Sequence, residues 1–460
     1  MNKIIKNNLL RASLVLILVF VLFAGNFEQK ISAQVTNCEC VPNEVIFELR
    51  VPANLPAVVT QYKLKPIPLG QVGTPPTYRM EIDTQQTNQT PPQIVMAMQG
   101  DTRITKPEVN RKLSSVEKPD LPWTIGHSWA IGHSWAIGGS GKGYQRQWFP
   151  EKIRLKEAHQ INRGTRIDNG QPVVVAVIDT GIDLSHPVFA GRLVPGYDFV
   201  GNDDNPSEEG VLYQDASYGH GTHVAGIVAL TAPEAKIMPI RILNRDGVGE
   251  LWRVTAAIIW AANHGADVIN ISFGYNSSPE LLKDVLHNCE GVAPPGVRSF
   301  SAEMNGERMV VISGAGNGGN GAKIYPAGDR IDPQLGVGAT TRSDHLADFT
   351  TMSVGHSGGL RFIRAVAPGE NIVSAIPGGR YGVWSGTSMA APIVSGIAAL
   401  VRAKNPMADP HSIVEQISET GIEWECVHPT RGEIKTNRVD AFCAVANNQS
   451  CGSNPNACMR

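Results

Sequence analysis

The chain has 460 residues, of which 42% are hydrophobic and 18% charged, enough for two or three domains or for one large domain with extensions. Its formal net charge of −2 supplies neither the basic footprint of a nucleic-acid-binding protein nor the polybasic stripe that attracts an anionic membrane. Both classes of partner are therefore disfavoured from the start.

The first 33 residues have the pattern of a secretory signal peptide. Two lysines and an arginine precede an uncharged run over 12–25, which is shorter than the roughly 20 apolar residues that a membrane span needs. The sequence ISA ending at Ala33 offers a cleavage site. We predict a signal peptide over 1–33, a secreted or periplasmic protein, and no stable membrane insertion after cleavage; the alternative is an uncleaved N-terminal anchor.

Residues 34–120 predict a small α+β domain. EVIFELRV (44–51) and TYRMEID (77–83) have the pattern of strands, and LPAVVTQYKLK (55–65) and PQIVMAMQ (92–99) have that of short helices. The segment contains no histidine and no cluster of catalytic side chains, so we do not expect the chemistry there.

The next segment, 121–143, is predicted to be a linker. It contains the hexapeptide GHSWAI twice in tandem, over 126–131 and 132–137, followed by GGSGKG. Two copies are too few for a solenoid. The alternatives are a metal site at His127 and His133, an aromatic docking strip, or a duplication within a flexible linker, which the glycine- and serine-rich run favours.

Residues 144–446 predict an α/β domain. Strands that are apolar on both faces alternate with helical stretches, a pattern typical of a mostly parallel sheet flanked by helices. The expected strands are PVVVAVID, AKIMPIRIL, ADVINISF and RMVVISGAG, and the expected helices include RVTAAIIWAANHG and PIVSGIAALVRAK. Because ligands of such sheets bind beyond the carboxyl ends of the strands, the residues that follow these strands are the candidates for function.

Seven cysteines in an exported chain permit disulfides and leave one thiol over. Four of them crowd the C-terminus, where residues 447–460 form a cysteine-containing tail, and four cysteines allow three pairings. These four are Cys426, Cys443, Cys451 and Cys458. Cys289 stands alone.

Three polar residues stand out at the ends of predicted strands or the starts of predicted helices. Asp179 ends the strand VVVAVID, where it is either functional or a cap of the next turn. Asn317 closes RMVVISGAGN and is either a turn residue or an amide aimed at an oxyanion. Ser388 precedes the helix APIVSGIAALVRA, where a serine is either an N-cap or a hydroxyl activated by the helix N-terminus.

The stretch GHGTHVAG adds two histidines, His220 and His223, at the start of an expected helix THVAGIVAL. A zinc pair on a helix is normally spaced i, i+4 with a glutamate between, as in HExxH. Here the spacing is i, i+3 and the glutamate is missing. Zinc is therefore disfavoured, which leaves a catalytic base or buried structural histidines.

Taken together, these segments resemble the subtilisin-like serine proteases (subtilases). VIDTGID, HGTHVAG and GTSMAAP are similar to the family's three signature segments, in the chain order Asp, His, Ser, and SGAGN is similar to its oxyanion segment. The resemblance covers roughly 147–446, from QWFPEKIRLKEAH to TNRVDAFCAV. It implies a subtilisin-like α/β fold and an exported serine endopeptidase that needs no cofactor for its chemistry.

The resemblance also implies roles for single residues. Asp179 would orient His220, His220 would act as general base for Ser388, and Ser388 would form the acyl-enzyme. Asn317 and the backbone N–H of Ser388 would hold the oxyanion, and His223 would be structural.

For substrate binding, the resemblance points to two backbone segments that pair with an extended polypeptide or wall its pocket. Ile324, before YPA, would lie near the floor of that pocket and make it shallower, which predicts a moderate apolar preference. The two segments consist of Ser272, Phe273 and Gly274, and of Gly314, Ala315 and Gly316.

Calcium is a common structural ion of the family. Val188 stands where many members carry a calcium-binding aspartate, which puts that site in doubt. The loop YDFVGNDDNP offers Asp198, Asp203 and Asp204 for a second site, the alternative being a solvated acidic loop.

The N-terminal domain is similar to a subtilase propeptide, so it would inhibit the protease until it is removed. The alternative is an uncleaved accessory domain. For the whole chain, two other functions stay open: a catalytically retired subtilase fold that serves as a binding module, and a peptide-processing acyl transferase.

Overall fold

The computed structural model describes residues 39–115, 124–125, 136–137, 139–212, 214–289, 308–319, 323–329, 331–351, 363–428, 432–448 and 451–454. Within these ranges, no helix has the length and hydropathy to cross a bilayer. The predicted signal peptide, both histidines of the GHSWAI repeat, and Cys458 lie outside the described residues.

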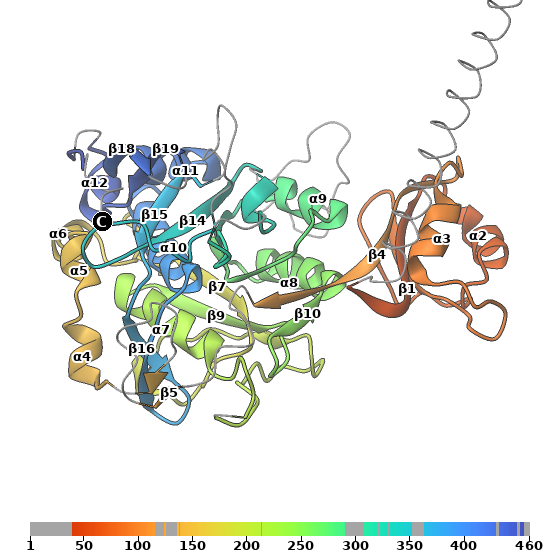
Figure 1. The fold of residues 1–460 in the computed structure, drawn as a ribbon, viewed down its shortest axis with the longest axis horizontal. Helices are drawn as coiled ribbons and strands as arrows, with labels where there is room; N and C mark the ends of the chain where they lie inside the picture. Colours follow the sequence, from red (N-terminus) through yellow and green to blue (C-terminus); the bar gives the residue numbers. More distant parts are fainter. Residues whose placement is uncertain are drawn as a thin grey trace, which may run out of the picture. The chain divides into compact units, whose positions relative to one another are not determined.

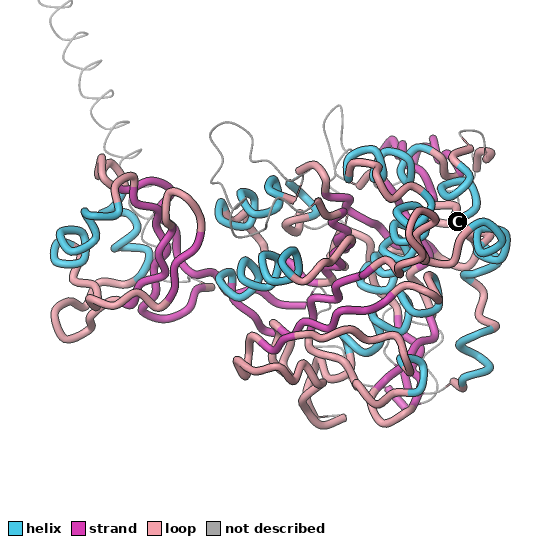
Figure 2. The backbone as a smooth tube through the Cα atoms, turned by 180° about the vertical axis from the view of Figure 1, so that it is seen from behind, coloured by secondary structure: helices cyan, strands magenta, loops and turns pink. Residues whose placement is uncertain are grey.

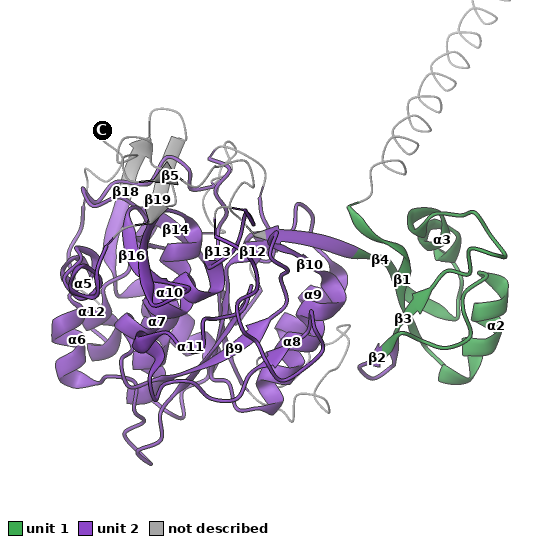
Figure 3. Cartoon of the chain, turned by 90° about the horizontal axis from the view of Figure 1, so that it is seen from below, with its two compact units in different colours: residues 1–70, 78–110 green, residues 71–77, 111–460 purple. Residues whose placement is uncertain are grey.

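The chain divides into two compact units (Figure 3). One consists of residues 1–70 and 78–110, and the other of residues 71–77 and 111–460. The division falls after Asn110, earlier than the boundary at 120 that the sequence suggested.

The first unit contains the strands and helices expected of it. Three alternate residues of its first strand, Val45, Phe47 and Leu49, pack with Ile94 and Met98 of a helix to form its core, as the two-residue period of a strand requires. In chain order, the elements are β1 (Cys40–Leu49), α2 (Leu55–Gln61), β2 (Gly70–Val72), β3 (Thr77–Glu81), α3 (Pro91–Met98) and β4 (Ile104–Ser115). The four strands are neighbours in the sheet in the order β4-β1-β3-β2.

The second unit is built on a nine-stranded sheet in the order β18-β19-β15-β14-β13-β11-β7-β9-β8, which confirms the predicted parallel architecture (Figure 1). All neighbours pair in parallel except β18 and β19. The strands are β7 (Val174–Asp179), β8 (Tyr197–Asp198), β9 (Lys236–Arg241), β11 (Val268–Ile271), β13 (Val310–Gly314), β14 (Gln334–Thr340), β15 (Ala365–Pro368), β18 (Ile422–His428) and β19 (Gly432–Arg438).

Helices cover both faces of this sheet (Figure 2). Val175 and Val177 of β7 belong to the core cluster that includes residues of α7 and α10, whereas Ala176 and Ile178, equally buried, alternate to the opposite face. The helices are α4 (Gly141–Gln145), α5 (Phe149–Lys152), α6 (Leu155–Ile161), α7 (His220–Thr231), α8 (Leu251–Asn263), α9 (Glu280–Asn288), α10 (Thr387–Lys404), α11 (Pro410–Glu419) and α12 (Ala441–Ala446).

Two further sets of short strands complete the second unit. In one, β5 (Thr124–Ile125), β6 (Ala136–Ile137), β17 (Arg380–Trp384) and β16 (Ile372–Ile376) pair in that order, so the predicted linker contributes two strands. In the other, the end of β4 pairs antiparallel with both β10 (Val248–Glu250) and β12 (Phe273–Gly274).

One disulfide lies in the described part of the tail, between Cys443 of α12 and Cys451. It resolves one of the pairings that the sequence left open. Cys289 is buried at the end of α9, where its thiol lies 3.7 Å from the carbonyl of Val285.

Candidate active site

Asp179 and His220 form a buried pair at the carboxyl edge of the sheet. Asp179 is the last residue of β7 and His220 is the first of α7. His220 Nδ1 lies 2.6 Å from Asp179 Oδ1, and neither side chain is exposed to solvent. Because Asp179 Oδ1 also accepts the backbone N–H of Thr180 at 2.7 Å, the carboxylate is fixed in a position that holds the imidazole ring by its Nδ1.

Glycines in GHGTHVAG allow this helix start to approach the strand. Gly219 has φ +91°, and a Cβ there would lie 2.8 Å from the Pro377 ring. A Cβ on Gly221 would collide with the carbonyl of Gly181. The helix therefore begins at His220, two residues earlier than the stretch THVAGIVAL suggested, and the N–H of Gly221 donates to Thr180 Oγ1 at 2.9 Å.

Ser388 lies at the same edge, one strand away from Asp179. Its hydroxyl donates to the carbonyl of Ser272 at 3.3 Å and is fully buried. Ser272 follows Ile271, which is paired with Ile178, so Ser272 comes level with Asp179 on the neighbouring strand. Adjacent strands lie roughly 4.8 Å apart, so the carbonyl that binds the Ser388 hydroxyl belongs to the chain segment next to that of Asp179.

The helix that carries Ser388 begins at Thr387, earlier than the sequence suggested, and contains Pro392 in its interior. Proline lacks the N–H that would bond to the carbonyl four residues before it, which is that of Ser388. The hydroxyl of Ser272 donates to this carbonyl at 3.3 Å instead. The proline that appeared to mark the helix start is therefore accommodated within the helix.

Asn317 is held from the same helix start. Its Oδ1 accepts the backbone N–H of Thr387 at 2.8 Å and the Thr387 hydroxyl at 3.0 Å. The amino group of the amide is consequently turned away from Thr387. The N–H of Ser388, the second residue of α10, belongs to the first turn, where backbone donors have no acceptor within the helix.

His223 packs inside the fold, away from Asp179. Its Nε2 is 3.3 Å from the carbonyl of Gly382, and its ring stacks on Trp384 with centroids 4.3 Å apart and planes 4° apart. Burial, followed by the nearby His220, lowers the pKa of His223 to about 3. The two histidines of the motif thus have different partners.

The predicted substrate segments border an occupied backbone edge. Ser114 and Ser115 at the end of β4 pair with Gly274 and Phe273, and Lys112 pairs with Glu250 on the other side. An extended stretch of this chain, itself part of the second unit, therefore lies between β10 and β12 as a middle antiparallel strand.

Ile324 fills the space beside these segments. A Cβ on Gly274 would collide with Ile324 Cγ2, and a Cβ on Gly316 would lie 2.6 Å from Ile324 Cγ1. One isoleucine side chain therefore contacts both predicted walls. That it makes the pocket shallow stays a prediction.

The acidic loop around Asp198 does not form a closed cation site in this arrangement. Asp198 Oδ2 accepts from the buried Arg241 at 2.8 Å, and Asp198 Oδ1 accepts from the N–H of Val200. Asp203 Oδ1 accepts from the N–H of Asn205 at 2.8 Å. Since an arginine holds the first carboxylate, calcium at Asp198, Asp203 and Asp204 stays a prediction.

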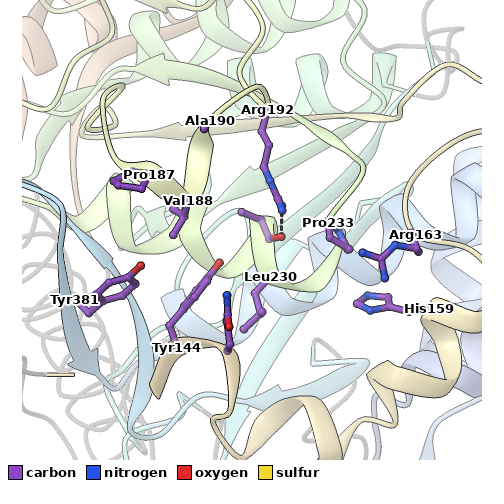
Figure 4. A pocket seen from close by; sticks show the side chains of 12 residues that line it. Tyr144, His159, Arg163, Pro187, Val188, Ala190, Arg192, Leu230, Pro233 and Tyr381 are labelled. Carbon is purple, nitrogen blue, oxygen red and sulfur yellow. Dashed lines mark hydrogen bonds between the residues drawn. The ribbon is translucent and has the colours of Figure 1, made fainter. Parts of the chain in front are cut away.

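Val188 lines a pocket of about 570 Å³ that also contains Arg192 and Arg163 (Figure 4). Arg192 donates to the carbonyl of Ala229 near the end of α7, and Arg163 is paired with Glu234. None of the described residues that line this pocket is acidic.

Among the described residues, one group brings three metal-ligating atoms together: Asp440, Cys443 and Cys451. The two cysteines are joined in a disulfide, and Arg154 Nε forms an ion pair with Asp440 at 2.7 Å. The cluster is therefore a structural tie between α12, the tail and Arg154.

Two threonines of the site were not singled out from the sequence. Thr180 accepts from Gly221 at the start of α7, and Thr387 holds the amide of Asn317. Both lie inside the quoted motifs, next to Asp179 and Ser388, and their position beside a candidate residue was the available signal.

Comparison with known proteins points to one family. The model of the subtilase family matches residues 170–441. A thermophilic serine proteinase from Bacillus sp. (strain AK1) is 35% identical over 314 residues, which are 66% of this chain and 67% of the relative. Thermitase from Thermoactinomyces vulgaris is 33% identical over 315 residues, 65% of this chain and 96% of the relative.

Among solved structures, fervidolysin from Fervidobacterium pennivorans, described as a keratinolytic enzyme related to subtilisin, is similar with a TM-score of 0.62. The two are 22% identical, and the likeness covers 90% of this chain and 62% of fervidolysin, so it bears on the fold alone.

The parallel sheet, with polar side chains gathered at its carboxyl edge, places the chain in the class of α/β hydrolytic enzymes. The chain belongs to the subtilase family, the subtilisin-like serine proteases. The family, fold class and enzyme class predicted from the sequence are confirmed.

Proposed function

We propose that the protein is an exported serine endopeptidase in which Ser388, His220 and Asp179 form the catalytic triad. His220 takes the hydroxyl proton of Ser388 through Nε2 while Asp179 holds Nδ1 and stabilises the imidazolium. The observation that carries the proposal is the 2.6 Å contact between His220 Nδ1 and Asp179 Oδ1 in a site with no solvent exposure.

Ser388 attacks the scissile carbonyl and forms an acyl-enzyme that water hydrolyses, with His220 returning the proton to the leaving amine. The hydroxyl must turn from the carbonyl of Ser272 toward His220 during the reaction. The distance of 3.3 Å marks a weak bond that is readily exchanged, and catalytic hydrogen bonds commonly tighten only when substrate binds.

The oxyanion is held by the Asn317 amino group and the N–H of Ser388. Thr387 fixes the amide before substrate arrives, so little reorganisation accompanies charge development. No residue of this scheme requires a metal or an organic cofactor.

We propose that substrate binds as the middle strand between β10 and β12, in the place taken here by Lys112–Ser115. Backbone pairing of this kind provides affinity with little sequence preference. The same occupancy supports the reading of the segment before the peptidase as an inhibitor, because Lys112–Ser115, which precede the predicted peptidase domain and belong to the second unit, take the edge that a substrate needs.

The pairing register also suggests where the chain is processed. Ser115, the last described residue of β4, pairs with Phe273, next to Ser272, whose carbonyl binds the Ser388 hydroxyl. We infer that the chain is cut beyond Ser115, C-terminal to the strand that occupies the substrate edge.

The test is expression of the Ser388→Ala chain beside the wild type. The wild type should hydrolyse peptides and lose its N-terminal domain, with a new N-terminus beyond Ser115 that N-terminal sequencing locates. The variant should do neither, and should accumulate with residues 34–120 attached. A variant that matures normally would mean that another protease makes the cut.

A further inference from the structure

Glu208 closes the N-terminus of the helix that carries His220, although it belongs to a separate loop. Its Oε2 accepts the backbone N–H of Thr222 at 3.1 Å and the Thr222 hydroxyl at 2.7 Å. Thr222 is the third residue of α7, so its N–H has no acceptor within the helix. Gly219, the N-cap residue, has no side chain to serve as a cap, and the glutamate takes that role.

The loop of Glu208 is tied to the segment that follows Asp179. The N–H of Glu208 donates to Ile182 at 3.1 Å, and the N–H of Ile182 donates to Pro206 at 3.0 Å. The N–H of Asp183 donates to the Thr222 hydroxyl at 2.9 Å. One hydrogen-bonded network therefore connects the strand end that carries Asp179 with the first turn that carries His220.

The carboxyl group of Glu208 is half-buried. Its pKa is raised to about 7, first by burial and also by the charge of Asp179, while hydrogen bonds from the Thr180 and Thr222 side chains and the Gly219 backbone lower it. Other titratable and charged groups surround Glu208 on the neighbouring elements. They are Asp179 and Asp183 at and after the end of β7, His220 at the start of α7, Glu209 and Tyr218 near Glu208 in the chain, and Arg241 and Arg380.

Ionisation of this glutamate does not serve stability. A carboxyl whose pKa is raised in the folded protein contributes stability below its ordinary pKa of 4.5, and that contribution is lost as the pH rises through about 7. A neutral glutamine could accept the same bonds from Thr222 without this loss. The charge therefore calls for a functional reason.

The helix itself supplies one. His220 is the first residue of α7, where the aligned peptide dipoles create a positive potential that disfavours the imidazolium. A negatively charged carboxylate that is hydrogen-bonded to the N–H groups of the first turn offsets this positive potential. An imidazolium that is easier to form makes the imidazole a stronger general base.

We propose that Glu208 is a positioning residue for His220, closing the first turn of α7 and offsetting the positive potential that the helix places on the imidazole. The inference rests on the proposed function of His220 as general base. It adds a second carboxylate, outside the triad, to the groups that govern that base.

The test compares Glu208→Gln, which keeps the acceptor and removes the charge, with Glu208→Ala, which removes both. The matched control is Glu209→Gln, because Glu209 is the adjacent residue, 65% exposed, and is paired with Arg241 rather than with α7. The readouts are the pH profile of kcat/KM on a peptide substrate and the titration of His220 by NMR.

In Glu208→Gln, the acid limb of the profile and the NMR midpoint of His220 should both move to lower pH by roughly half a unit. The alanine variant should show the same shift and also a reduced plateau of kcat, since the helix start is loosened. The control should match the wild type.

Thermal unfolding adds a second readout, in which the proposal and a purely structural role predict opposite changes in stability. When the pH is raised from 5 to 8, the glutamine variant should lose less stability than the wild type, because its residue 208 has no carboxyl group to ionise. A purely structural glutamate would give a variant that is less stable at both pH values, with an unshifted His220.

The inference is overturned if the midpoint of His220 is the same in wild type and Glu208→Gln, or if Glu209→Gln shifts it equally. The NMR titration does not depend on turnover, so it judges Glu208 by itself. A wild-type protein that hydrolyses no peptide would instead contradict the proposed function.

Discussion

Asn317 is the residue whose removal separates transition-state stabilisation from binding. Replacing it by alanine removes a donor to the oxyanion and leaves the triad in place. We expect kcat to fall roughly 100- to 1,000-fold, as on removal of an oxyanion-hole donor of a subtilisin, with KM little changed. Thr387→Val keeps the amide but loosens it, so its loss of kcat should be smaller. An Asn317→Ala enzyme with unchanged kcat would contradict the assignment.

Ile324 is the residue expected to set the size of the side chain accepted before the cut. Since it contacts both Gly274 and Gly316, replacing it by glycine should deepen the pocket. The ratio of kcat/KM for phenylalanine over valine at that position should rise about tenfold or more. Peptides that differ only at this residue provide the measurement, and an unchanged ratio would assign the pocket floor to another side chain.

At the scale of single elements, the start of α7 depends on a glycine in the left-handed region. Gly219→Ala places a methyl group against the Pro377 ring and strains φ at +91°. Gly170 has φ +71° and open space around it, so Gly170→Ala isolates the backbone strain, about 1 kcal/mol. In denaturant unfolding, Gly219→Ala should lose clearly more stability, and it alone should lose activity. Equal losses would show that the approach of α7 is not sterically fixed.

The same elements show what the sequence could and could not predict. Apolar runs ending in polar residues predicted β7, β11 and β13 and the edge at which Asp179 and Asn317 lie. Both functional helices begin earlier than expected, because their first turns are stabilised by partners distant in sequence. Glu208 caps α7, and Ser272 takes the carbonyl that Pro392 leaves without a donor. Local patterns contain no signal for such partners.

At the scale of the whole molecule, the sequence predicted a separate N-terminal domain and a parallel α/β domain. It did not predict that Lys112–Ser115 would pair with β10 and β12, because strand pairing between distant segments depends on the folded edge that each presents. The predicted linker likewise contributes β5 and β6, whose two-residue length carries no pattern.

The central claim is that Ser388 is made nucleophilic by His220 within a working peptidase. The most direct measurement is labelling of the mature wild-type protein with a fluorophosphonate, followed by mass spectrometry of its peptides. The account predicts one adduct, on the peptide that contains Ser388, with hydrolysis lost in proportion to labelling and no adduct in His220→Ala. A folded, mature protein that takes up no label would contradict it and favour a binding module that has retained the subtilase fold.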